Sequence, residues 1–217
     1  MTTDAATIAR RMGAADVLAR LADALESGDG STVTQLAATL PRPPTTTIRL
    51  PIAPPTTSEV TRAKVKAPSL RPSQKFAIYR RDGFVCRLSP ERWRLLYPGA
   101  LRVLSLLLPE AIPTQLSSHG IPARYPDNSP IWWDVWPAVD HVHPRSLEGG
   151  TNDPQNLVCV SWWRNDAKSN RSLESTGWQL QPPGDVSEWD GLYGWFTRQI
   201  AARPDLRDDV MVRNWNI

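Results

Sequence analysis

Four polar residues in the second half of the chain have types and spacing that suit hydrolytic chemistry. Asp140 and His141 are adjacent, Asn156 follows 15 positions after the histidine, and Asn165 lies nine positions further on. Carboxylate and amide oxygens bind a hard divalent cation. An imidazole can take a proton from water near neutral pH. Together these groups predict one metal ion with one activated water beside it, which is what phosphodiester hydrolysis requires.

Magnesium is the metal that this ligand set favours. Asp140 supplies a carboxylate and Asn165 a neutral carbonyl oxygen, so a site with two protein ligands keeps room for phosphate oxygens and water. Two histidine ligands would instead have suited zinc or nickel. We therefore expect Mg²⁺ at Asp140 and Asn165, with Mn²⁺ as a substitute.

The other motif residues have supporting roles that the sequence leaves open. His141 suits a general base, but adjacent residues on a strand point to opposite faces, so a bulge or a strand end is needed to aim His141 and Asp140 at one phosphate. The Asn156 amide would either orient the His141 ring or hold the loop. Lys168, one helical turn after Asn165, would either contact phosphate or anchor the helix.

Strand, loop, strand and helix are the elements expected to position the motif. Residues 136–142 and 156–162 have the pattern of strands, a Gly149-Gly150 loop separates them, and a helix is expected from Asn165 to about Ser175, ending at Gly177. The tryptophans that flank the strands are expected to pack around them: Trp132, Trp133, Trp136, Trp162 and Trp163.

Three segments are expected along the chain. Residues 1–40 predict a helical hairpin, with helices over 5–28 and from Ser31 or Thr32 to Leu40, packed on the main domain or on another copy. Residues 41–71 form a Pro-rich linker. Residues 72–217 are expected to form the main folded unit. It should contain a helix from a Ser73 cap to Tyr79–Arg81, a strand at 84–86 and a helix over 91–109 broken at Pro98-Gly99. A loop over 113–130 and a helix from Asp185 or Ser187 to Ala202 are expected as well.

Charge is concentrated just before the folded part. Segment 41–81 holds nine Lys or Arg and one acid, Glu59, which gives +8 within a chain of net charge +3. Such a segment suits a phosphate-binding arm, through residues such as Lys64 and Lys66, or an extended solvated linker. No apolar run long enough for a membrane helix occurs, and two cysteines fit a reduced, cytoplasmic setting.

The motif resembles the HNH family of nucleases, which have the ββα-metal fold. The matching residues are Asp140-His141-Val142-His143-Pro144, Gly149-Gly150, Asn156-Leu157 and Asn165-Asp166-Ala167-Lys168, and residues 79–86 look like the family's lead-in to its first zinc-knuckle cysteine. The resemblance covers roughly residues 73–175. It implies His141 as general base, Asn156 as the orienting catalytic residue, and Asp140 and Asn165 as metal ligands.

The chain departs from this family at the zinc knuckle. Many relatives bind a structural zinc through two Cys-x-x-Cys pairs. Here Ser89 stands where the second cysteine of the first pair would be, three residues after Cys86. The second pair would fall at Ser161 and Arg164. Four thiolates cannot be assembled from Cys86 and Cys159, so no structural zinc is expected and both thiols should be buried.

The sequence thus predicts an α+β protein: an HNH core with surrounding helices, a helical hairpin and a basic linker. Its expected function is a metal-dependent endonuclease acting on double-stranded DNA, working as a homodimer if both strands are cut. Arg145, Arg164, Lys168, Lys64 and Lys66 are the expected nucleic-acid contacts. The alternatives are a non-catalytic DNA-binding module of the same fold and a nuclease or toxin directed at RNA.

Overall fold

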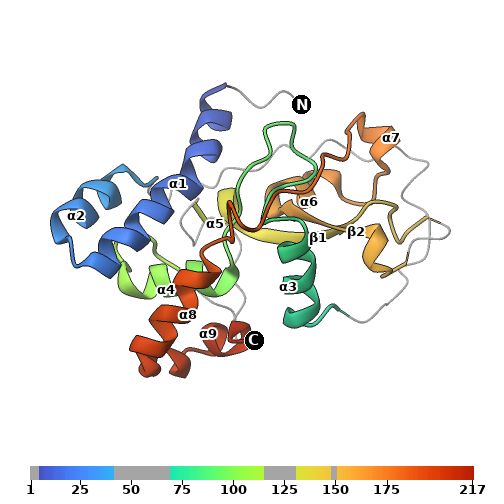
Figure 1. Ribbon diagram of the computed structural model, residues 1–217. Helices are drawn as coiled ribbons and strands as arrows, with labels where there is room; N and C mark the ends of the chain where they lie inside the picture. Colours follow the sequence, from blue (N-terminus) through green and yellow to red (C-terminus); the bar gives the residue numbers. More distant parts are fainter. Residues whose placement is uncertain (1–4, 42–68, 115–130, 148–150) are drawn as a thin grey trace.

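The protein combines helices with one small sheet, as the α+β prediction requires. The computed structural model describes residues 5–41, 69–114, 131–147 and 151–217, and Figure 1 shows their arrangement. In chain order the elements are α1 (Ala5–Ser27), α2 (Gly30–Thr39), α3 (Pro72–Arg81), α4 (Pro98–Leu107), α5 (Ile131–Val135), β1 (Pro137–His141), the 3₁₀ helix η1 (Pro154–Asn156), β2 (Leu157–Ser161), α6 (Trp162–Lys168), α7 (Leu173–Thr176), α8 (Tyr193–Ala202), the 3₁₀ helix η2 (Pro204–Asp208) and α9 (Val210–Trp215).

The sheet consists of β1 and β2, paired antiparallel with Val139 opposite Cys159. Every residue of β2 is buried, which explains its continuous apolar run. Two strands alone are marginally stable in water, so the sheet depends on its cover. Both α3 and α6 pack against both strands, with α6 following β2 directly (Figure 1). The two predicted motif strands are confirmed, each shortened at its ends.

A buried carboxylate joins α3 to the sheet. Asp82 ends α3 and is fully buried. It accepts the backbone N–H of Cys159, in the middle of β2, at 2.7 Å, and it forms ion pairs with Arg81 at 2.8 Å and Arg87 at 3.3 Å. Because a buried charge is stable only when it is paired and hydrogen-bonded, this arrangement fixes where α3 meets β2.

The N-terminal hairpin is confirmed, and it packs on the rest of the chain. The α2 helix is capped by Asp29, which accepts the N–H of Thr32, whereas the sequence suggested Ser31 or Thr32 as the cap. The Trp195 indole of α8 donates to the Ala22 carbonyl of α1 at 3.1 Å, and Arg198 pairs with Glu26 at 2.7 Å. Of the two expected partners for the hairpin, the main domain is the one contacted here.

The helix predicted over 91–109 is wrong in its first half. Only α4 is helical; of the residues before it, Trp93, Leu95, Leu96 and Tyr97 are buried, but none is helical. Pro98 was expected to break a helix; it begins one instead, because a proline at the first helical position loses no internal hydrogen bond. Tyr97 precedes α4 and is surrounded by five aromatic rings, those of Phe76, Phe84, Tyr193, Phe196 and Trp215.

Other boundaries also differ from the predictions. The expected strand at 84–86 is a single bridge between Val85 and Arg94, and α3 begins at Pro72 with Arg71 as cap. The motif helix starts at Trp162, capped by Ser161, and ends at Lys168; α7 is a separate turn. At the C-terminus α8 begins only at Tyr193, and η2 and α9 were not predicted. Within the predicted loop 113–130, residues 115–130 lie outside the described ranges.

Tryptophans pack around the motif strands, as predicted. Trp132 is almost fully buried and its ring lies 5.4 Å from that of Trp136, while the rings of Trp133 and Trp162 are 4.0 Å apart. Cys86 and Cys159 are free, buried thiols. Burial raises the pKa of both thiols, so neither is poised to react. None of the helices in the described ranges is both long and apolar enough to span a bilayer.

Candidate active site

The C-terminal end of β1 carries the two central residues of the motif. Asp140 lies opposite Val158 and His141, the last residue of the strand, lies opposite Leu157. Asp140 is buried, whereas His141 is half-buried. The Asp140 Oδ1 atom accepts the backbone N–H of His141 at 2.7 Å. The strand end thus presents a partly exposed imidazole beside a buried carboxylate.

Lys168, at the end of α6, is the direct partner of this strand end. Its side chain is fully buried. The ammonium donates to the His141 carbonyl at 2.8 Å and lies 3.1 Å from the Asp140 Oδ2 atom, an ion pair outside hydrogen-bond geometry. Of the two roles considered from the sequence, this position is that of a helix anchor. A phosphate contact finds no support, because the ammonium does not reach the surface.

The electrostatics of Asp140 follow from its burial. Desolvation raises the pKa of Asp140 above its usual range, although the Lys168 ammonium and the His141 N–H act in the opposite direction. Among the described residues, the Lys168 ammonium is the ion-pair partner of the Asp140 Oδ2 atom, and the His141 N–H is the hydrogen-bond donor to its Oδ1 atom.

A residue that the sequence did not single out holds the His141 ring. The Oδ1 atom of Asn152 lies 2.9 Å from Nε2 of His141. A carbonyl oxygen can only accept, so this contact places a proton on Nε2 and leaves the Nδ1 lone pair available as a base. Asn152 belongs to the loop after Gly149-Gly150, and nothing in its spacing indicated a contact with His141.

Asn156 holds the loop rather than the ring. Its Oδ1 atom accepts the His143 N–H at 2.8 Å, and its Nδ2 atom donates to the carbonyls of His143 at 3.0 Å and Thr151 at 2.9 Å. One amide thus ties the exit of β1 to the residue just before Asn152. The expectation that Asn156 orients His141 directly is corrected: it acts through the loop that presents Asn152.

Asn165 lies on α6, one helical turn before Lys168 and therefore on the same side of the helix. Because Lys168 reaches the end of β1, this side is the one that faces Asp140 and His141. Asn165 is half-buried, and its side-chain amide has no partner among the residues that the structure describes. The amide oxygen is thus free to bind a ligand.

Arg164 has a different environment from the phosphate contact that was expected. Its guanidinium contacts the rings of Trp93 and Trp178, 5.1 and 4.6 Å from their centroids, and lies 4.0 Å from the Glu91 carboxylate. Only 17% of the side chain is exposed. A guanidinium in contact with two indoles and largely shielded from solvent has a structural role.

The remaining predicted nucleic-acid contacts are less defined. Arg145 is half-buried in the turn that follows β1, close in sequence to His141. Lys64 and Lys66 lie outside the described residues, as does the Gly149-Gly150 pair.

The residues present fit a divalent cation. In the described residues Asp140 Oδ2 is paired with the Lys168 ammonium alone and the Asn165 amide on α6 has no partner, so a carboxylate and an amide supply two hard oxygens. The described ranges contain no group of three or more His, Cys, Asp or Glu side chains suited to a metal. A magnesium ion that keeps most of its water needs no such group.

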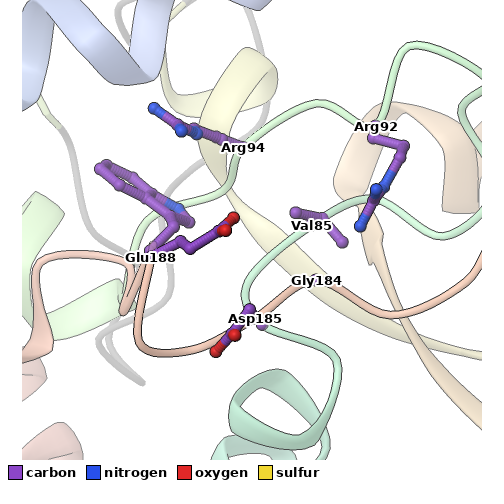
Figure 2. Close-up of a pocket in the computed structure, with 8 residues that line it drawn as sticks. Val85, Arg92, Arg94, Gly184, Asp185 and Glu188 are labelled. Carbon is purple, nitrogen blue, oxygen red and sulfur yellow. The ribbon is translucent and has the colours of Figure 1, made fainter.

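A cavity of about 200 Å³ lies away from these residues. It is lined by Gly83, Val85, Arg92, Arg94, Gly184, Asp185, Glu188 and Trp189 (Figure 2). Two arginines, Arg92 and Arg94, face two acids, Asp185 and Glu188, so the lining has no net preference for one sign of charge. None of the motif residues lines it.

Comparison with protein-family models, with curated proteins and with solved structures found no match for this chain.

Proposed function

We propose that this protein is a metal-dependent endonuclease that hydrolyses phosphodiester bonds in DNA. The observation that carries the proposal is the end of β1, where a histidine ring fixed by Asn152 lies beside a buried carboxylate. The resemblance of the motif to the HNH nucleases points to the same function. The antiparallel pair β1–β2 followed by α6 has the order of elements that this family's ββα-metal fold requires.

The chain's own groups account for the proton transfer. With Nε2 of His141 bonded to Asn152, Nδ1 takes a proton from the attacking water as general base. Asp140 and Asn165 would hold the divalent ion, which supplies positive charge to the scissile phosphate and the leaving oxygen. Asn156 keeps the loop closed, and Lys168 keeps α6 against β1.

DNA is proposed as the substrate because of the chain's basic segment and the family resemblance. One site cuts one strand, so a single copy should nick duplex DNA, and a double-strand break would need two copies. The rival functions are binding without catalysis and cleavage of RNA, and both are outcomes of the test.

The test is relaxation of supercoiled plasmid with Mg²⁺, with Mn²⁺ and with a chelator. Wild type should nick the plasmid only with a divalent ion, and His141→Ala should be inactive. His143→Ala is the matched control, because His143 is an exposed histidine two residues away and should keep activity. An inactive wild type with every metal, or an active His141→Ala, refutes the proposal. Faster cleavage of an RNA of matched sequence would reassign the substrate.

A further inference from the structure

A buried lysine faces the carboxylate that is proposed to bind the metal. The Lys168 side chain is fully buried, and both of its contacts are with the end of β1: Asp140 Oδ2 at 3.1 Å and the His141 carbonyl at 2.8 Å. Lysine is rarely buried unless its charge is paired. Asp140 is the only acid among the ion-pair partners of Lys168 in the described part of the chain.

The oxygen that faces Lys168 is the one that has capacity for a metal. Asp140 Oδ1 already accepts the His141 N–H at 2.7 Å, whereas the polar partner of Oδ2 in the described part of the chain is the Lys168 ammonium at 3.1 Å. A divalent ion would supply more charge to the same atom.

We propose that Lys168 is an internal counter-ion that a divalent cation displaces from Asp140 when the site is loaded. The inference rests on the proposed function, because it takes Asp140 as a metal ligand. An ammonium and a divalent ion on one carboxylate oxygen would lie a few ångströms apart and repel strongly in a partly dry site.

The geometry gives the lysine a second position without unfolding α6. Lys168 carries its charge on four methylene groups, so the ammonium can leave Oδ2 and keep its bond to the His141 carbonyl. Asn165, one turn earlier on the same side of α6, supplies the second ligand. Metal binding thus exchanges one cation for another at Asp140. Lys168 is a positioning residue, since it holds Asp140 and His141 in place before the metal arrives.

The first test measures Mn²⁺ affinity by titration of its electron-spin signal. Lys168→Met removes the charge, and Lys168→Gln removes it but keeps a donor for the His141 carbonyl. Both should bind Mn²⁺ at least about tenfold more tightly than wild type, since a repelling charge has been removed. Lys75→Met, at a half-buried lysine of α3, should match wild type, and Asp140→Asn should lose the site. Unchanged or weaker binding by both Lys168 variants overturns the inference.

The second test uses the unmodified protein, so it holds even if the variants fail to fold. Amine acylation of each lysine is followed by mass spectrometry with and without Mg²⁺. Displacement should increase the acylation rate at Lys168 several-fold on addition of Mg²⁺, while Lys75 stays constant as internal reference. A Lys168 rate that is unchanged or lowered by Mg²⁺ refutes displacement. Neither readout requires nuclease activity. A protein that exchanges its cations but does not nick plasmid would support this inference and contradict the proposed function.

Discussion

Arg164 stands at a position where the family resemblance would place a zinc ligand, and replacing it should reveal what stabilises this part of the fold. The perturbation is Arg164→Met, which keeps the apolar stem of the side chain and removes the guanidinium. The guanidinium contacts the rings of Trp93 and Trp178 and lies 4.0 Å from Glu91.

The magnitude follows from these contacts. Each cation–π contact of a largely desolvated guanidinium contributes about 1–2 kcal/mol. The buried Nε atom of Arg164 has no hydrogen-bond partner among the described residues, and removing it recovers about 1 kcal/mol of desolvation cost. The Glu91 pair at 4.0 Å adds little. The expected loss in free energy of unfolding is therefore about 1–3 kcal/mol.

The assay is equilibrium urea unfolding followed by far-UV circular dichroism, since the substitution alters the surroundings of two fluorescent tryptophans. Arg213→Met is the matched control, because Arg213 is exposed on α9 and its loss should cost less than about 0.5 kcal/mol. A loss for Arg164→Met no larger than that of the control would refute the idea that the guanidinium stabilises this cluster.

A second experiment introduces the three thiols that a four-cysteine zinc site would need in addition to Cys86. The Cys86 Sγ atom lies 3.7 Å from the Ser161 Oγ atom, which matches the separation of about 3.8 Å between two sulfurs around tetrahedral zinc. The triple variant Ser89→Cys, Ser161→Cys, Arg164→Cys should bind Co²⁺ with the visible absorption of a tetrahedral thiolate site. The same variant without Ser161→Cys should bind far more weakly. Equal spectra from the two would show that these four positions do not converge.

Three further outcomes are expected. Asn152→Ala should slow plasmid nicking about tenfold or more, because the His141 ring loses the hydrogen-bond partner that it has among the described residues. The free energy of unfolding should change by less than about 1 kcal/mol, and an unchanged nicking rate counts against the assigned role. Asn156→Ala removes three hydrogen bonds and should cost about 2–3 kcal/mol in urea unfolding. Asp209→Asn should cost about 1–2 kcal/mol at pH 7. Burial favours the neutral acid, but the hydrogen bond and charge of Arg102, together with the backbone N–H groups of Val212 and Met211, outweigh it and lower the pKa of Asp209. That stability is present above the unfolded pKa of about 4 and lost as pH falls through the folded value, so the difference from wild type should vanish in acid.

Much of the fold could be predicted from local patterns. The α1–α2 hairpin, the two strands of the motif and the helix after them follow from periodicity, from turn residues and from capping groups, all of which act over a few residues. Pro98 shows the limit of that approach. A proline can end a helix or begin one, and only the packing of the buried residues before it decided that α4 begins there.

For the candidate site, the sequence by itself determined the chemical groups and their order: Asp140 beside His141 on a strand end, and Asn165 and Lys168 one turn apart on the next helix. Only the tertiary structure decided which groups meet. It placed Asn152 on the His141 ring, buried the Lys168 ammonium against Asp140, and brought the Arg164 guanidinium into contact with two indoles. The physical reason is that spacing along a chain fixes the face of an element on which a side chain lies, whereas its partner comes from a loop or helix whose approach depends on the whole core.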